Sequence, residues 1–154
     1  MTYETSLATE NYSGTTLLLQ VSGAQNGIPV LLMLICPQKN DKIRALFYEL
    51  SGLFQNEFVP KALAKKARVD AFGALLEKKL AKLCKDCCGI LAVCDEAYVI
   101  VLGDAQAAIL QSFLGKERFV GLEDGICMIE DGLEIRLKGY AEEKEFAGRL
   151  VVKE

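Results

Sequence analysis

The sequence feature that most constrains the fold is an uninterrupted run of apolar side chains over residues 30–36. A run of this kind is typical of a strand that other elements cover on both faces. Pro37 follows the run, and a proline ends a central strand because it lacks the N–H that the ladder needs. The run is too short to span a bilayer. We therefore expect a central strand with protein packed against both of its faces.

Two amphipathic helices are predicted after this strand. Asn40 or Asp41 can cap the first helix, and Asp70 can cap the second. The Val59-Pro60 pair is expected to end the first helix, because the residue before a proline avoids helical geometry. Apolar residues recur at helical spacing at Ile43, Leu46, Phe47, Leu50, Leu53, Phe54 and Phe58, and again at Phe72, Leu75, Leu76, Leu80, Leu83 and Cys84.

Strand patterns lie on both sides of the helical region. The predicted strands cover residues 2–9, 15–21 and 30–36 before the helices, and residues 89–94, 97–102, 107–113, 125–130 and 133–138 after them. Asp131-Gly132 separates the last two strands and is a hairpin turn signal. Residues 140–150 are predicted to form a short acidic helix or tail.

This order of strands, two helices and more strands predicts the α+β class. We expect mainly antiparallel β-sheets, arranged like a sandwich, with two long amphipathic helices packed on them. The 154 residues suit a single domain, residues 1–154, with a sizeable core.

Composition limits the location and the chemistry of this chain. The first ten residues are polar and lack the basic start and apolar run of a signal peptide, so we expect a cytoplasmic protein. The six cysteines are then expected to be free thiols. The chain contains no histidine, which excludes a Ser-His-Asp triad, a Cys-His dyad and every His-ligated zinc site. Hydrolytic chemistry would have to use carboxylates, thiolates or lysines.

Residues 89–110, GILAVCDEAYVIVLGDAQAAIL, contain two apolar runs around the turn candidate Asp95-Glu96. The second run ends at Gly103-Asp104. This segment resembles the hairpin of the metal-dependent Ser/Thr protein phosphatases of type 2C, whose second strand ends in Gly-Asp-Ser-Arg. Here the four residues are Gly-Asp-Ala-Gln. The order of early strands, two helices and this hairpin also matches, from about residue 15 to about residue 110.

The resemblance implies hydrolysis of phosphomonoesters by a water molecule that bridges two Mg²⁺ or Mn²⁺ ions. Such ions need converging carboxylates, and an arginine usually grips the phosphate. Asp104 matches the Gly-Asp pair, and Asp131, in Glu-Asp-Gly-Leu, aligns with a Ser-Asp-Gly-Leu metal motif of the family. The resemblance therefore implies Asp104 and Asp131 as metal ligands. The alternative interpretation makes both of them turn residues.

Other parts of the phosphatase machinery are missing. The place of the metal-bridging Asp-Gly of the family is residues 35–38 here, which contain no carboxylate. Residues 1–38 contain no lysine or arginine to grip a phosphate, and a final Asp-Asn motif is absent. We therefore predict a noncatalytic type 2C phosphatase-like domain that acts through binding, with no catalytic residue and no cofactor. The alternative is a reduced but active Mg²⁺- or Mn²⁺-dependent phosphatase that uses Asp104, Asp131 and other acids such as Asp124.

A thiolate site is a second alternative. Cys84, Cys87 and Cys88 form a cluster with CxxC spacing, and Cys94 follows. Four thiolates can hold zinc or an iron–sulfur cluster, and a redox-active pair is also possible because nearby lysines favour the thiolate form. Structural or free thiols explain the same residues.

Residues 39–86 contain eleven basic and six acidic residues, a net charge of +5 in a chain whose net charge is −3. An acidic partner is one interpretation, and a solvated helix face is the other. Aromatic residues do not alternate with these cations in the sequence, so no nucleic acid is expected. A protein partner is possible, and no membrane association is expected. The cations between and along the helices are Lys61, Lys65, Lys66, Arg68, Lys78, Lys79, Lys82 and Lys85.

Overall fold

The computed structural model describes residues 1–7, 13–22, 27–139 and 145–153 of the chain. Its strands form two five-stranded sheets in which every neighbouring pair is antiparallel. The covered sheet has the order β2 (Thr15–Ser22), β3 (Pro29–Cys36), β4 (Cys88–Val93), β5 (Glu96–Val101) and β8 (Gly125–Met128). The open sheet has the order β1 (Thr2–Leu7), β10 (Gly148–Lys153), β9 (Glu134–Lys138), β6 (Gln106–Phe113) and β7 (Lys116–Leu122).

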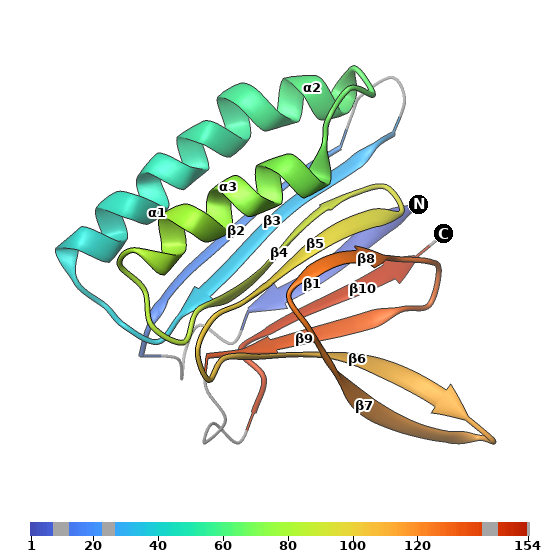
Figure 1. The fold of residues 1–154 in the computed structure, drawn as a ribbon. Helices are drawn as coiled ribbons and strands as arrows, with labels where there is room; N and C mark the ends of the chain where they lie inside the picture. The colour runs from blue at the N-terminus through green and yellow to red at the C-terminus, as the bar shows by residue number, and fades with distance from the viewer. Residues whose placement is uncertain (8–12, 23–26, 140–144, 154) are drawn as a thin grey trace.

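The helices pack on one face of the covered sheet, and the open sheet packs on its other face (Figure 1). Strand β3 lies in the middle of these layers, and all eight of its residues are buried. Successive side chains of a strand point to opposite faces, so Leu32 and Leu34 meet the helices while Leu31 and Met33 meet the open sheet. The predictions of a doubly covered strand and of an α+β fold with mainly antiparallel sheets are confirmed.

The first helical segment is longer than predicted. It runs through α1 (Asp41–Leu53), a π-helical turn η1 (Phe54–Phe58) and α2 (Val59–Leu63) without a break. Asn40 caps it, since its Oδ1 accepts a hydrogen bond of 3.0 Å from the N–H of Ile43. The expected end at Val59-Pro60 is wrong. The N–H of Val59 bonds to the carbonyl of Phe54, five residues back, and this wider turn lets Pro60 sit in the first turn of α2, where its missing N–H is tolerated.

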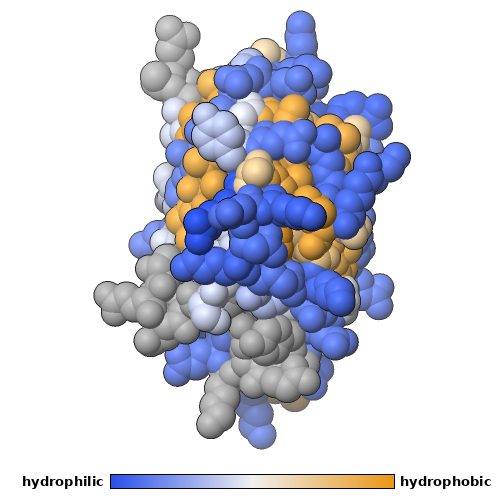
Figure 2. Space-filling model, turned by 90° about the vertical axis from the view of Figure 1, so that its left-hand side faces the viewer, coloured by the Kyte–Doolittle hydropathy of each residue, from blue (hydrophilic) through white to orange (hydrophobic). Residues whose placement is uncertain are grey.

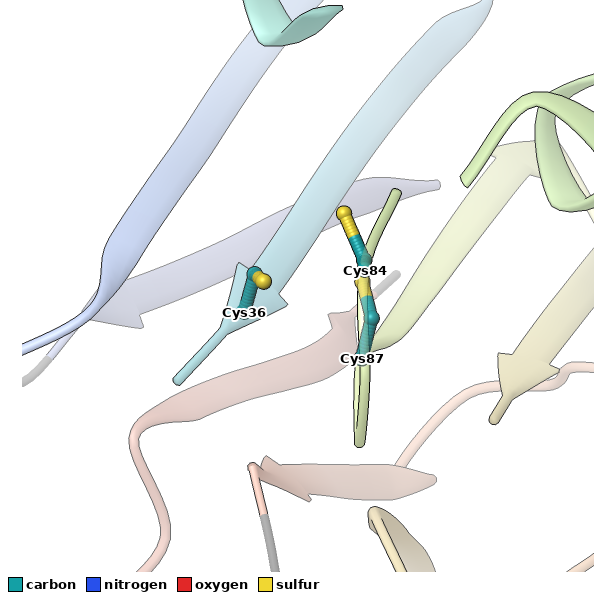
Figure 3. Close-up of side chains that lie close together, drawn as sticks. All are labelled: Cys36, Cys84 and Cys87. Carbon is teal, nitrogen blue, oxygen red and sulfur yellow. The ribbon is translucent and has the colours of Figure 1, made fainter. Parts of the chain in front are cut away.

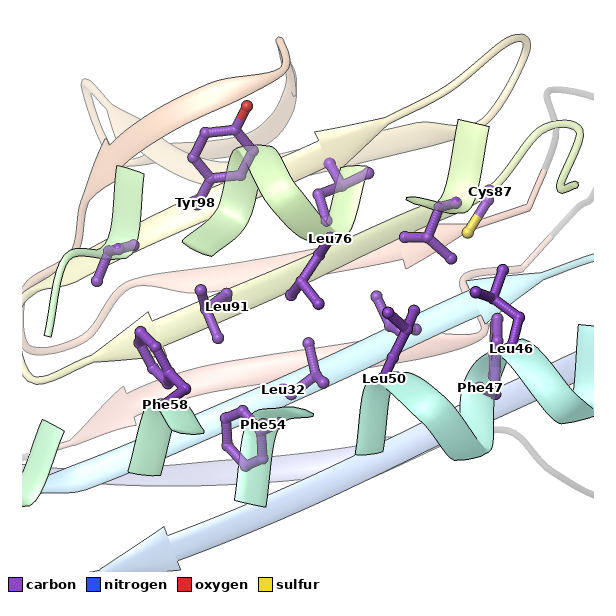
Figure 4. Packing of buried hydrophobic residues seen from close by; sticks show 14 of the residues in the cluster. Leu32, Leu46, Phe47, Leu50, Phe54, Phe58, Leu76, Cys87, Leu91 and Tyr98 are labelled. Carbon is purple, nitrogen blue, oxygen red and sulfur yellow. The ribbon is translucent and has the colours of Figure 1, made fainter. Parts of the chain in front are cut away.

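The second helix, α3 (Val69–Ala81), has thirteen residues, so only the first of the two helical segments is long. The buried faces of both segments point at the covered sheet. Figure 4 shows Phe54, Phe58 and Leu76 over Leu32 and Leu91. No helix among the described residues has the length and apolar character needed to cross a membrane.

One connection and two strands differ from the expectations. Asp131-Gly132 does not close a hairpin, because β8 belongs to the covered sheet and β9 to the open sheet. The turn instead carries the chain from one sheet to the other, and the N–H of Gly132 donates to Val152 in the open sheet. Residues 116–122 form a strand, β7, that was not predicted. Strand β10 begins at Gly148, so residues 148–150 of the expected acidic helix or tail are in a strand instead. Residues 8–9 and 140–144 of the predicted elements lie outside the described residues.

Candidate functional site

Three cysteine side chains meet at one end of the covered sheet. Cys36 is the last residue of β3, Cys84 follows the end of α3, and Cys87 immediately precedes β4. Their Sγ atoms all lie within 4.8 Å of one another (Figure 3). Cys36 and Cys87 are fully buried and Cys84 is 6% exposed. We call this group the cysteine cluster.

The pairing of β3 with β4 brings the cluster together. Ile35 lies opposite Cys88 in this antiparallel ladder, so Cys36 and Cys87 are neighbours just beyond its end. The N–H of Cys84 donates to the carbonyl of Leu80 over 2.8 Å, which continues the last turn of α3 and holds Cys84 over the same corner. The cluster therefore joins one strand end to the connection between α3 and β4.

The Gly103-Asp104 turn braces this connection. The N–H of Asp104 donates to Oδ1 of Asp86 over 2.7 Å, and the N–H of Leu102 donates to the carbonyl of Cys87 over 2.9 Å. Gly103 has a φ of +62°, and a Cβ added there would lie 2.3 Å from Oδ1 of Asp86, so only glycine fits. The Gly-Asp pair that carries the phosphatase resemblance thus has a structural role beside the cysteines.

Gln38 completes the surroundings of the cluster. Its Oε1 accepts a hydrogen bond of 2.9 Å from the N–H of Lys85 and lies 3.0 Å from Sγ of Cys36. A protonated Cys36 donates a hydrogen bond to this oxygen. A deprotonated Cys36 instead sets two electron-pair donors against each other, and a cation held between them would turn that contact into shared coordination.

The pKa values of the three thiols are shifted in opposite directions. Hydrogen bonds from the thiols of Cys84 and Cys87 stabilise the Cys36 thiolate and lower the pKa of Cys36 to about 4. The same interaction favours the protonated partners: it raises the pKa of Cys84 to about 12 and raises the pKa of Cys87. Of the three thiols, Cys36 is therefore the one that loses its proton most readily.

The donor set suits a soft, thiophilic cation. Thiolates select Zn²⁺ and Cu⁺, whereas Mg²⁺ and Mn²⁺ prefer carboxylate and water oxygens. Three sulfurs in a tetrahedral zinc site with bonds of about 2.3 Å lie about 3.8 Å apart, so the cluster would contract by at most about 1 Å. Such an ion would bind the three sulfurs and leave one position for the Gln38 oxygen or a water molecule. Within the described residues, no other group of three cysteine or acidic side chains converges in this way.

The remaining cysteines lie elsewhere. Cys88 points to the opposite face of the covered sheet, where its Sγ donates to the carbonyl of Lys138 over 3.1 Å. Cys94 lies in the β4–β5 turn, at the far end of β4, and Cys127 lies in β8. The structure thus unites Cys84 and Cys87 of the predicted thiolate site and puts Cys36 in the place expected for Cys88.

The two predicted metal ligands lie near opposite ends of β5. Asp104 follows the Val101 end, whereas Asp131 lies beyond the Glu96 end, where Ile129 bonds to the carbonyl of Asp95. Six residues of strand separate these ends by roughly 20 Å at about 3.3 Å per residue. Both aspartates are exposed. Metal binding at either of them stays a prediction, and a shared two-metal cleft gains no support from this arrangement.

Asp124 belongs to a small polar group with Glu77 of α3 and Tyr98 of β5. Its Oδ1 accepts a hydrogen bond of 2.9 Å from the N–H of Val101, and its side chain interacts with Glu77. The hydroxyl of Tyr98 donates to Oε2 of Glu77 over 3.1 Å. Partial burial and the neighbouring Asp124 carboxyl raise the pKa of Glu77 to about 7. The contact between Glu77 and Asp124 joins α3 to the β7–β8 connection.

Figure 2 shows the side of the molecule on which, in Figure 1, β3 ends and α1 begins. Apolar side chains show in the half formed by the helices and the covered sheet, and hydrophilic side chains dominate the described residues in the other half. The three cysteines lie beneath the surface, because each is almost fully buried.

Sequence patterns missed Cys36 because its apolar run explains it as a small core residue. The CxxC spacing pointed to half of the cluster. The third cysteine of the cluster, Cys36, follows from the pairing of β3 with β4, and the periodicity of a single segment does not predict that pairing. No protein-family model matches this sequence, and neither the curated proteins nor the solved structures contain a match to it.

Proposed function

We propose that this chain is a noncatalytic binding domain whose cysteine cluster holds a single thiophilic metal ion, with Zn²⁺ as the first candidate. One observation carries the proposal: three buried sulfurs converge from segments 48 residues apart in the sequence, Cys36 and Cys84. A single buried thiol packs as a small apolar group, but three sulfurs that converge within 4.8 Å of one another match the arrangement of thiolates around one cation.

Burial favours a bound ion over thiol exchange. A redox-active cysteine needs an accessible thiolate that can attack or be attacked, and Cys36, the group with the lowered pKa, is fully buried. A metal ion can enter while the chain folds and then be enclosed. Metal binding also releases the protons of Cys84 and Cys87, so affinity should rise with pH.

The position of the cluster also fits the phosphatase resemblance in its noncatalytic form. The segment that ends β3 is where the type 2C phosphatases place a metal-bridging Asp-Gly, and here it is Cys36-Pro37-Gln38. The two face-to-face antiparallel sheets and the order of strands, two helices and a Gly-Asp hairpin support the same relationship. We infer a scaffold of this kind in which thiolates replace the carboxylates that would hold Mg²⁺ or Mn²⁺.

The test is a metal titration of the reduced, metal-free protein. We expect one Zn²⁺ per chain in competition with a chromophoric chelator, a higher melting temperature with the metal, and sulfur-to-cobalt charge-transfer absorption when Co²⁺ replaces Zn²⁺. Cys84→Ala should lose the charge-transfer band, because it removes one of the three sulfur ligands. Cys84 is the least buried of the three, so this variant is expected to keep its fold. Cys127→Ala removes a cysteine outside the cluster. It should leave the zinc stoichiometry and the charge-transfer band unchanged.

A folded wild-type protein that takes up neither Zn²⁺ nor Cu⁺ would overturn the proposal. A Cys84–Cys87 disulfide that forms under mild oxidation and stabilises the fold would favour the redox alternative. Incubation with Mn²⁺ and an aryl phosphate tests the catalytic alternative: turnover that disappears in Asp131→Ala would replace the noncatalytic proposal with an active phosphatase.

A further inference from the structure

A hollow of about 420 Å³ lies between the end of the first helical segment and the start of α3. Its apolar floor consists of Phe58, Ala71, Phe72 and Leu75. The rings of Phe58 and Phe72 are in contact, with centroids 4.7 Å apart, so the floor is firmly packed. Leu75 is 39% exposed, so an apolar side chain that entered the hollow would cover it.

Three cations stand on the rim of this hollow: Lys61, Lys66 and Arg68. The N–H of Lys66 donates to the carbonyl of Lys61 over 2.8 Å, so the turn between the helices fixes the two lysines next to each other. Glu57 is the acidic residue among those that line the hollow, and Arg68 pairs with Asp70 just outside it. Across the described residues, neither Lys61 nor Lys66 takes part in an ion pair.

We propose that this hollow binds an acidic peptide segment of a partner protein that carries a large apolar side chain flanked by carboxylates. The apolar side chain would cover Leu75 and the floor, and the carboxylates would meet Lys61 and Lys66. Charge complementarity supports this occupant, because residues 39–86 carry a net charge of +5 within a chain of net charge −3. The volume lies within the range of about 300–1,000 Å³ that is typical of ligand pockets.

A nucleic acid fits the same surface less well. Base stacking needs an open ring face. Phe58 is 2% exposed and packs between Phe54 and Phe72, so its ring is enclosed. Phe72 is then the single partly exposed ring among the residues that line the hollow, which is too few for a run of stacked bases. The net negative charge of the rest of the chain also repels a long polyanion more than a short acidic segment.

The experiment measures the fluorescence anisotropy of a labelled peptide, Asp-Asp-Glu-Leu-Phe-Glu-Asp-Asp, titrated with the full chain at moderate ionic strength. We expect saturable binding that weakens by about tenfold or more in the double variant Lys61→Glu/Lys66→Glu, because charge reversal replaces attraction by repulsion. Leu75→Ser should weaken binding several-fold. Lys116→Glu, a single charge reversal at the start of β7 in the open sheet, should change the Kd by less than about twofold.

Three results would overturn the proposal: no saturable binding by the wild-type chain, equal binding of a peptide with Ser-Ser in place of Leu-Phe, or equal weakening by Lys116→Glu. Tighter binding of a short oligothymidylate than of the peptide would also overturn it and identify the surface as a nucleic-acid site. The substituted lysines are exposed, so matching melting temperatures are expected and confirm that each variant is folded.

Discussion

The two sheets of this protein differ in what covers their outer faces. The covered sheet turns Leu32, Leu91 and Ile100 toward the helices, and all three are fully buried. The described residues place no helix on the outer face of the open sheet. Its β9 accordingly alternates, with Ile135 in the core and Arg136 on the outer face. Two sheets of equal strand number thus have different sequence patterns, because a strand needs apolar residues only on the faces that other elements cover.

Ion pairs and contacts between arginine and aromatic rings stabilise the outer face of the open sheet. Glu134 is 6% exposed and accepts hydrogen bonds from Nε of Arg136 over 2.8 Å and from Nε of Arg149 over 2.7 Å. The guanidinium of Arg136 lies 4.4 Å from the ring centroid of Phe119 and 5.8 Å from that of Phe146. A polar network on this face takes the place of the apolar layer under the helices. We therefore expect substitutions in the covered sheet to cost more stability than substitutions on this face.

The largest effect is expected from Leu32→Ala in β3. Leu32 is fully buried between the helices and the covered sheet, so its truncation leaves a cavity between these two layers. The expected loss is about 2–5 kcal/mol in the free energy of unfolding, measured by urea titration. A loss below that of the polar substitutions described below would show that the helices do not pack firmly on this sheet.

Gly73→Ala tests how closely α3 approaches the covered sheet. A Cβ at Gly73 would lie 2.2 Å from Cγ of Tyr98, so the helix or the ring would have to move. We expect a loss of about 1–3 kcal/mol from overpacking, despite the higher helix propensity of alanine.

Gly52→Ala in α1 is the matched control for Gly73→Ala. At Gly52 the nearest atom to the new Cβ is Nδ2 of Asn56, 4.0 Å away. This substitution should stabilise the protein by about 0.5–1 kcal/mol. If the two glycine variants had the same melting temperature, the close contact between α3 and Tyr98 would be contradicted.

Glu134→Gln tests the network on the open sheet. The substitution removes a negative charge that Arg136 and Arg149 share in a nearly buried position, and we expect a loss of about 1–2 kcal/mol by chemical denaturation. Glu4→Gln, which breaks the exposed pair with Lys153, should cost less than about 0.5 kcal/mol. Equal effects of the two variants would mean that the outer face has no cooperative network.

The smallest effect is a pH dependence at Glu77. The pKa of this carboxyl is raised in the folded protein to about 7, so the folded state binds the proton more tightly than the unfolded chain does. The stabilisation is therefore complete at pH values below the unfolded pKa, decreases as pH rises toward 7, and is absent above it. Glu77→Gln should flatten this part of the profile of melting temperature against pH. A wild-type profile that the substitution leaves unchanged would contradict a raised pKa of Glu77 in the folded protein.

Local sequence patterns are enough to give the layers of this protein. The apolar run that became β3, the helical faces that cover it and the Gly-Asp hairpin of β4 and β5 all follow from local periodicity. Local patterns suffice for these elements, because the spacing of the apolar residues in a strand or helix shows which of its faces is buried.

The contacts between distant segments became known only from the folded structure. It sent Asp131-Gly132 between sheets instead of into a hairpin, set Asp104 and Asp131 at opposite ends of β5, and brought Cys36 to Cys84 and Cys87. Each of these outcomes depends on strand pairing across long stretches of chain, such as Ile35 with Cys88. The periodicity of a single strand gives its faces but not its partner, so the cysteine cluster emerges only when β3 and β4 lie side by side.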